Sequence, residues 1–443
     1  MAKAPTRATI RTYHVGFGDC FLISFQYARK SERHVLIDFG STGFPKGVPK
    51  SRMMEIAEDI KQRTGGKLHA VVATHRHRDH ISGFATAKAR NGTGDIIKSL
   101  KPDLVVQPWT EDPKLAPNAT GPSGSSAMTK KFGAGTSEQV TALSLMHEVA
   151  SHSLAARNLP KESSREIGFL GESNIANPSA VKNLMTMARN SYVYCGSKSG
   201  LEKVLPGVKV EVLGPPTLKQ TDTIRQQRSR DPDEFWHFQV GATALAAAVE
   251  RSGTALFPRH VESRGYSHCI NARWLVNRAR MVRGEQLLQI VHALDQEMNN
   301  TSVILLFQVG KKKLLFPGDA QIENWQYALS QKKYLKPLRS VNLYKVGHHG
   351  SLNATPKSLW KLFKNKSERK TANRLLSLMS TMEGKHGSVY GHTEVPRTPL
   401  VRELQRESDL FTTQHLKGKD FFHDNVLPSR DNNMVWQATR GGH

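Results

Sequence analysis

Short apolar runs separated by polar turns recur near both ends of the chain. Residues 9–15 and 20–27 form two such runs joined by Gly16-Phe17-Gly18-Asp19, which predicts a β-hairpin. A further strand is predicted over 35–40. Residues 53–63 repeat apolar side chains at helical spacing, so a helix is predicted there. The N-terminal region therefore alternates between strands and helices, as α/β folds do.

The C-terminal region has the same pattern. Strands are predicted over 303–309, 313–316, 341–346 and 375–380, helices over 322–329, 356–363 and 398–405, and closing strands over 411–413 and 434–438. The middle of the chain is harder to interpret, because residues 113–136 are rich in Gly, Ser, Pro and Thr and predict a long loop. Further along this middle region, a helix is predicted over 137–157 and a strand over 208–213.

The densest candidate chemistry follows a buried strand predicted over 68–74, and a helix is predicted directly after it, over 81–88. The loop between them contains His75, His77, Asp79 and His80, in the pattern H-x-H-x-D-H. Alternate side chains such as His75 and His77 can converge on one metal ion, and Asp79 and His80 then face a second. Imidazole and carboxylate ligands suit two divalent ions, with zinc expected and manganese possible.

Further candidate ligands follow strands of the second half. Asp319 comes after the strand predicted over 313–316, and His348 and His349 come after the strand over 341–346. A carboxylate such as Asp319 can bridge two cations about 3.5–4 Å apart, and a bridging hydroxide can then attack phosphorus or a carbonyl. Asp38, at the end of another predicted strand, is expected to hold the metal loop by hydrogen bonds rather than to bind metal.

The charge of the chain points to an anionic partner. Its 63 Lys and Arg residues outnumber 38 Asp and Glu residues, which gives a formal net charge of +25. Such a field attracts polyanions, of which nucleic acid is the most common. Arg273, Arg278 and Arg280 lie in an arginine-rich stretch and are candidate nucleic-acid contacts, although a merely solvated helix face would have the same composition.

Cysteine usage and hydropathy address the compartment. Cys20, Cys195 and Cys269 are scattered and odd in number, so neither a disulfide framework nor a cysteine metal site is expected. No apolar run is long enough to span a bilayer and no signal peptide is evident, so we expect a cytoplasmic protein without membrane contact.

The order of the motifs resembles a known family. The sequence contains, in order, Gly-Asp-Cys, Leu-Ile-Asp-Phe-Gly, Thr-His-x-His-x-Asp-His, Asn-Asn-Thr-Ser-Val, Phe-Pro-Gly-Asp, Val-Gly-His-His-Gly-Ser and Gly-His. This order resembles the metallo-β-lactamase superfamily and, within it, the metallo-hydrolase domain of ComEC-type competence proteins, here in a stand-alone form. The resemblance covers about residues 8–90 and 296–440.

The resemblance implies an αββα sandwich of two mixed sheets, with the metals at one edge. We therefore expect a single domain over 1–443, composed of a first half (1–90), an insertion (91–295) and a second half (296–443). Phosphodiester hydrolysis is implied, with DNA as the expected substrate.

The resemblance also implies roles for individual residues. His75 and His77 would bind one metal, Asp79 and His80 the other, and Asp319 would bridge, so that Asp79 and Asp319 take part in catalysis. His348 or His349 would complete a site. Many superfamily members have another histidine where this chain has Asn299, Asn300 and Thr301. Asn300 is therefore expected to support the site from behind the ligands, and the first metal either takes a ligand from the His348–His349 pair or stays open. His392 is a candidate phosphate contact.

Taken together, the sequence predicts a metal-dependent phosphodiester hydrolase that acts on nucleic acid, with a DNase as the expected enzyme. Two alternatives stay open. One is a hydrolase of a small phosphodiester, such as a phosphocholine ester or a nucleotide. The other is a non-catalytic nucleic-acid-binding protein with structural metals.

Overall fold

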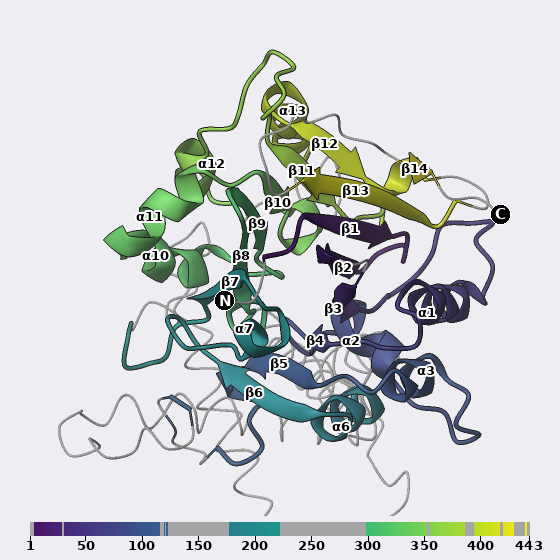
Figure 1. Cartoon of the computed structure of the whole chain (residues 1–443). Helices are drawn as coiled ribbons and strands as arrows, with labels where there is room; N and C mark the ends of the chain where they lie inside the picture. The colour runs from purple at the N-terminus through teal and green to yellow at the C-terminus, as the bar shows by residue number, and fades with distance from the viewer. Residues whose placement is uncertain are drawn as a thin grey trace, which may run out of the picture.

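Two β-sheets packed face to face form the centre of the computed structural model, and helices cover both outer faces (Figure 1). The structure describes residues 4–28, 31–115, 119, 121–122, 177–221, 298–351, 355–385, 394–416, 420–428 and 439–440. This is an α/β fold with two mixed sheets, consistent with the metallo-β-lactamase sandwich that the sequence predicts.

The first sheet has eight strands in the order β14-β13-β1-β2-β3-β4-β5-β6. Their bounds are β1 Arg7–Tyr13, β2 Cys20–Gln26, β3 Glu32–Phe39, β4 Ala70–Val72, β5 Leu104–Pro108, β6 Arg189–Val193, β13 Phe422–Pro428 and β14 Thr439–Arg440. Strands β3 to β6 are parallel, whereas β13, β1 and β2 form antiparallel pairs. In a parallel arrangement the carboxyl ends of β3 and β4 meet at one edge of the sheet.

The second sheet has six strands in the order β12-β11-β10-β9-β8-β7. Their bounds are β7 Val208–Gly214, β8 Ile304–Val309, β9 Lys312–Phe316, β10 Leu343–Lys345, β11 Leu376–Met379 and β12 Asp409–Thr412. Strands β9 to β12 are parallel, and β7 and β8 are antiparallel. Strands β5, β6 and β7 come from the range 91–295, so part of the expected insertion contributes to both sheets.

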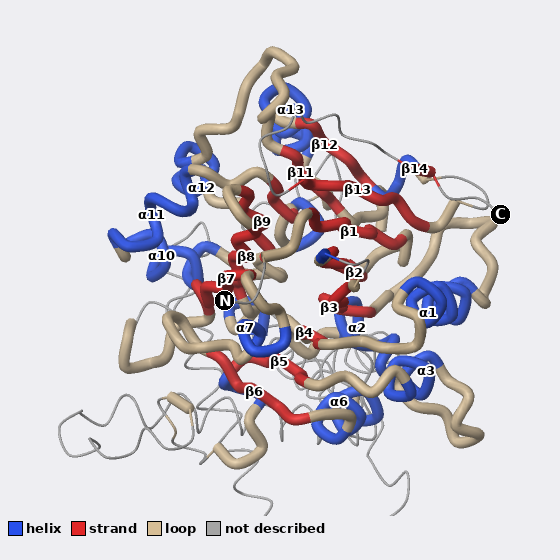
Figure 2. Tube along the Cα trace, viewed as in Figure 1, coloured by secondary structure: helices blue, strands red, loops and turns tan. Residues whose placement is uncertain are grey.

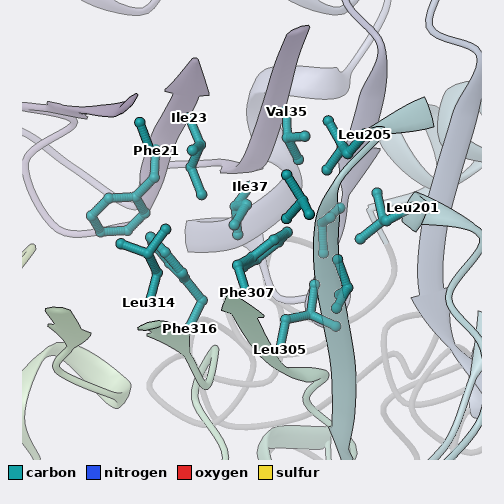
Figure 3. Packing of buried hydrophobic residues seen from close by; sticks show 14 of the residues in the cluster. Phe21, Ile23, Val35, Ile37, Leu201, Leu205, Leu305, Phe307, Leu314 and Phe316 are labelled. Atoms are coloured by element: carbon teal, nitrogen blue, oxygen red, sulfur yellow. The ribbon is translucent and has the colours of Figure 1, made fainter. Parts of the chain in front are cut away.

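Apolar side chains from the two sheets interdigitate to form the central core (Figure 3). Phe21 of β2 meets Phe316 of β9 edge to face, with 5.7 Å between ring centroids. Phe307 of β8 packs against Phe25 and Phe316 on the same interface. Because each such side chain contributes roughly 1.5–3 kcal/mol when fully buried, this layer provides the rigid base for the loops at the sheet edge.

Helices cover the outer faces of the sheets (Figure 2). On the first sheet lie α1 Arg52–Arg63, α3 Thr93–Ser99 and α6 Pro178–Thr186. On the second lie α10 Ile322–Ser330, α11 Lys332–Arg339, α12 Lys357–Leu362 and α13 Thr398–Glu407. Shorter helical segments are α2 Arg78–Ile81, η2 Ser82–Phe84, η3 Trp109–Glu111, α7 Leu201–Val204, η8 His348–Gly350 and η9 Thr413–His415.

Several expected elements differ from the structure. The helix predicted over 81–88 is wrong: α2 begins inside the histidine motif and ends at Ile81, and the chain is extended by Ala85. The chain passes through a 3-10 turn, η2, and then leaves helical geometry, because the carbonyl oxygen of Phe84 accepts from the Asn183 side chain at 2.8 Å and that of Ala85 accepts the N–H of Gly94 at 3.1 Å. Helix α11 and strand β13 were not predicted, and the elements expected over 137–157 and 434–438 lie outside the described residues.

Among the described residues, no helix is both long enough and apolar enough to cross a membrane.

Candidate metal centre

A cluster of buried histidines and aspartates lies at the edge where the parallel strands end. His75, His77, Asp79 and His80 follow β4, Asp319 follows β9, and His348 and His349 follow β10. Because β4 belongs to the first sheet and β9 and β10 to the second, the loops of both sheets meet over this edge. Residues that are far apart in the sequence are brought together there, as at many α/β sites.

Close backbone contacts hold the histidine motif in place. Gly18 and Gly40 lie directly beneath it, where a Cβ on Gly18 would come within 2.7 Å of the Asp79 carbonyl oxygen. A Cβ on Gly40 would come within 2.4 Å of the His80 nitrogen. In addition, the backbone N–H of Asp19 donates to the Asp79 carbonyl at 2.8 Å. The turn 16–19 and the residue after β3 therefore pack directly against the backbone of the histidine motif, an approach so close that it requires glycine at positions 18 and 40.

Four side chains of this edge are arranged so that they could hold a metal ion, and we call this group the four-ligand pocket: Asp79, His80, Asp319 and His349. Each offers one ligand atom, and these atoms all lie within 4.8 Å of one another. The Nε2 atom of His349 lies 3.1 Å from Asp79 Oδ2, and the Nε2 atom of His80 lies 3.0 Å from Asp319 Oδ2. Two imidazoles and two carboxylates are a donor set that suits zinc or manganese.

Hydrogen bonds behind the pocket orient both histidine rings. His80 Nδ1 lies 2.8 Å from Asp38 Oδ2, and His349 Nδ1 lies 3.0 Å from the carbonyl oxygen of Ser380. Because a carbonyl oxygen can only accept, Nδ1 of His349 carries a proton, and Nε2 is the nitrogen that could bind a cation in exchange for its own proton. Asp38 also accepts from the backbone N–H and the hydroxyl of Thr74, both at 2.7 Å. Ligand histidines are commonly fixed by such partners.

The electrostatics of the pocket favour positive charge. Burial alone would lower the pKa of His80, but the carboxylates of Asp319, Asp38 and Asp79 outweigh it and raise this pKa well above its usual value. His349 behaves in the same way, with Asp319 and Asp79 raising its pKa. Burial alone would raise the pKa of Asp79, yet His80 and His349 hold it below its usual value. In addition, the buried Asp79 Oδ1 has no hydrogen-bond partner among the described residues. A divalent cation that displaces the protons fits these observations.

Asp319 is held so that one oxygen faces the pocket. Its Oδ1 accepts the backbone N–H of His348 at 3.0 Å and lies 3.4 Å from Lys345 Nζ. Its Oδ2 faces the two histidines, at 3.0 Å from His80 Nε2 and 3.6 Å from His349 Nε2. The loop reaches this position through positive φ angles at His348 (+42°) and His349 (+52°), which are uncommon for non-glycine residues and cluster at functional sites.

Two contributors to this site were missed from the sequence, Asp19 and Lys345. Lys345 is only 2% exposed, forms an ion pair with Asp19 and donates to the carbonyl oxygen of Gly318 at 3.1 Å. Burial would lower the pKa of Lys345, but Asp19 and Asp319 outweigh it and raise the pKa, so the ammonium is retained. The one sequence signal was a lysine inside an otherwise apolar strand, which is also compatible with an exposed position.

A second group of possible metal ligands lies beside the four-ligand pocket and consists of Asp19, Asp38 and His80. Because Asp19 is paired with Lys345 and Asp38 is bonded to Thr74, these carboxylates already have partners. A cation there would have to compete with a buried ammonium. We therefore interpret this group as a support of the four-ligand pocket.

The remaining candidates are placed as follows. His75 and His77 are buried, and His75 Nε2 lies 3.0 Å from His77 Nδ1. Neither belongs to a group of three or more His, Cys, Asp or Glu ligands among the described residues. Of the histidine pair, His349 points into the four-ligand pocket, whereas His348 contributes its backbone N–H. Asn300 is fully buried near this edge. His392, Arg273, Arg278 and Arg280 lie outside the described residues.

Comparison with known families agrees with this geometry. The family model described as Metallo-beta-lactamase superfamily matches residues 14–122, which include the glycine turn, Asp38 and the histidine motif. No curated protein matches the chain.

Proposed function

We propose that this protein is a metal-dependent phosphodiester hydrolase that acts on nucleic acid, with DNA as its substrate. The observation that carries the hydrolase part is the four-ligand pocket, which is buried, ringed by carboxylates and located at the edge where the strands of both sheets end. Structural zinc sites are usually closed and rich in cysteine, whereas this donor set has none.

Each residue of the pocket has a role that follows from its contacts. Asp79, His80, Asp319 and His349 would hold the cation, while Asp38 and the Ser380 carbonyl fix the two histidine rings. Lys345 ties Asp19 and Asp319 together and so joins the first half of the chain to the second. When bound, divalent cations supply Lewis acidity and acidify water at the site.

The charge of the molecule supports a polyanionic substrate. Helices α11 and α12 and the loop after them form a basic face: exposed or half-exposed Lys332, Lys333, Lys336, Arg339, Lys357, Lys361, Lys364, Lys366, Arg369 and Lys370. Glu368 is the only acidic residue between Lys332 and Lys370. The backbone N–H of Lys364 donates to the Arg339 carbonyl at 2.8 Å, which joins the two parts of the face. Such a surface fits a phosphate backbone.

The finer assignment to a ComEC-like branch is supported by the order of the motifs. The Asn-Asn-Thr-Ser-Val and Val-Gly-His-His-Gly-Ser stretches both lie at the edge where the parallel strands end and the four-ligand pocket is found, here called the metal edge. Arg273, Arg278 and Arg280, together with His392, stay proposed phosphate contacts.

Cleavage of linear and circular DNA by the purified full chain, with manganese, zinc or magnesium, tests this function. An Asp79→Ala variant is the control. Metal-dependent cleavage that the variant lacks is the expected result, and cleavage of the circle would identify an endonuclease. Absence of DNA cleavage together with turnover of a small phosphodiester would overturn the substrate, and DNA binding without any turnover would overturn the enzyme.

A further inference from the structure

Lys345 lies inside the second sheet, where charged side chains are rarely found. It is the last residue of β10, which is flanked by β9 and β11, and it is only 2% exposed. Its ammonium group forms an ion pair with Asp19, lies 3.4 Å from Asp319 Oδ1 and donates to the Gly318 carbonyl oxygen at 3.1 Å. A buried charge is costly unless it is paired, so this lysine is expected to act on the carboxylates that it contacts.

Asp19 connects Lys345 with the four-ligand pocket. Its backbone N–H donates to the Asp79 carbonyl oxygen at 2.8 Å, and its carboxylate lies 3.7 Å from Nδ1 of both His80 and His349. Each of these rings turns its other nitrogen, Nε2, toward the carboxylates of the pocket. Asp19 is therefore not one of the four ligands, but its negative charge lies close to both histidine ligands.

Lys345 and Asp19 act on a cation in the pocket with opposite signs. The ammonium lies at Oδ1 of Asp319, whereas Oδ2 of the same carboxylate faces the pocket, so the ammonium repels a cation bound there. The carboxylate of Asp19 attracts the same cation. Because all three side chains are almost fully buried, screening by water and salt is weak and both effects persist.

We infer that Lys345 is a built-in cation of the metal edge, and that its balance with Asp19 sets how tightly the four-ligand pocket holds its metal ion. The inference rests on the proposed metal-dependent function. With both residues present their charges largely cancel, so the pocket keeps the affinity that its own two carboxylates provide. With only one of them present, the surroundings of the pocket change by one unit of charge.

A pair that served only to join the two halves of the chain would give a different result. Loss of either partner would then loosen the loop that carries Asp319, and metal binding would weaken in both cases. The charge balance instead predicts opposite changes for the two partners, which cancel when both are replaced. The sign of the change therefore separates the two roles.

Isothermal titration calorimetry of the metal-free full chain with manganese and with zinc measures this affinity without DNA. Lys345→Met, which keeps the length of the side chain, is expected to lower the dissociation constant by about tenfold, because the charge of Asp19 is left unbalanced. Asp19→Asn is expected to raise it by about tenfold, because Lys345 is left to compete with the metal for Asp319. The double variant is expected to return to within about threefold of the natural protein.

Lys312→Met is the matched control. Lys312 is also a buried lysine of the second sheet, 3% exposed, and it donates to Asn373 Oδ1 at 3.2 Å. It is the first residue of β9, whereas Asp319 follows the last residue of the same strand, so Lys312 lies at the end away from the pocket. Its replacement is expected to leave the metal affinity within about twofold of the natural value.

Circular dichroism of each variant shows whether the fold is kept. If Lys345→Met does not fold, Asp19→Asn and the double variant decide the question. Weaker binding in Asp19→Asn and near-natural binding in the double variant are then both required.

The inference is overturned if both single variants weaken metal binding, or if the double variant stays as far from the natural protein as Asp19→Asn does. It is also overturned if Lys312→Met changes the affinity as much as Lys345→Met. Failure of the proposed function would look different, because the natural protein would then bind no metal, or Asp79→Ala would still cleave DNA.

Discussion

Two pairs of buried histidines differ in what surrounds them: one pair lies at the amino ends of β3 and β4, and the other follows the carboxyl ends of β4 and β10. His34 and His69 lie at the amino ends of β3 and β4, where His34 Nδ1 meets the Ser24 hydroxyl at 2.9 Å and the His34 N–H donates to His69 Nδ1 at 3.0 Å. At the carboxyl ends, His80 and His349 face Asp79 and Asp319.

The pKa values separate the two ends. Burial, together with neighbouring arginines, lowers the pKa of His34 and of His69 to about 4. At the metal edge the carboxylates raise the pKa of His80 and His349 instead. Burial of histidine is thus not the mark of a metal site. A metal site is indicated instead by an excess of carboxylate charge around the histidines, which a bound cation can neutralise.

The largest expected difference is in the rate of DNA cleavage, when one residue is changed at the metal edge and one at the amino ends of β3 and β4. Asp79→Ala removes a ligand of the four-ligand pocket and is expected to lower the rate of DNA cleavage by more than about 100-fold. His69→Asn, which keeps an acceptor for the His34 N–H, is expected to leave the rate within a factor of two or so, because it touches no residue of the pocket. Comparable losses in both variants would erase the functional distinction between the two ends.

Removal of bound metal is expected to lower the free energy of unfolding, and only the residues of the metal edge are expected to be responsible. A cation that binds only the folded state adds about 2.7 kcal/mol at a concentration 100 times its dissociation constant. Thermal melting with and without a chelator measures this difference. The shift is expected to persist in His69→Asn and to vanish in Asp79→Ala. A chelator that leaves the melting temperature of the natural protein unchanged would contradict it.

Lowering the pH is expected to reduce the free energy of unfolding through His34 and His69, the pair at the amino ends of β3 and β4. Histidine in the unfolded chain titrates near pH 6.5, whereas folded His34 and His69 resist protonation down to about pH 4. Between these values the unfolded state binds more protons, so stability is full above about pH 6.5 and is lost as the pH falls toward 4. The loss is on the order of 1–2 kcal/mol for each histidine, after allowance for partial burial.

Urea unfolding of the metal-free protein at pH 7 and pH 4.5 measures this effect. His69→Asn is expected to lose less stability between the two pH values than the natural protein. An identical loss in both proteins would show that the pair does not titrate as its surroundings indicate.

The smallest effect is expected from the basic face, which touches neither histidine pair. Replacing Lys332, Lys333 and Lys336 by Gln is expected to weaken DNA binding by about tenfold and to reduce the salt slope by up to about 0.9 for each lost phosphate contact. The exposed Lys61, Lys88 and Lys98, on the side of α1 and α3, provide the matched triple control. Equal weakening in both triples would indicate diffuse charge rather than a specific face.

Much of this architecture follows from local pattern. The strands of both halves were predictable because short apolar runs end at Gly, Asp or His. The ligand loop was predictable because four ligand types follow one strand. Helix α11 was not, because Pro337 and four basic side chains obscure a face on which only Tyr334 and Leu338 are buried. Strand β13 was missed because its polar centre is stabilised by a distant partner, the ion pair between Arg11 and Asp424.

The sequence predicted those ligands of the site that lie within one short motif, but not the contacts between residues that are distant in the sequence. The choice of His349 over His348 depends on two positive φ angles. The pairing of Lys345 with Asp19 joins the two halves of the chain, and no spacing rule connects these residues. The helix expected after the motif was wrong for the same reason, since the carbonyl oxygens of Phe84 and Ala85 accept hydrogen bonds from Asn183 and Gly94, which lie outside the expected helix.

The most direct test of the account is a crystal structure of the protein grown with manganese or zinc, with the metals located by anomalous scattering. The account predicts the strongest peak among Asp79, His80, Asp319 and His349, with the Asp19–Lys345 pair intact beside it. A strongest peak between Asp19 and Asp38, or no peak at the metal edge, would contradict it.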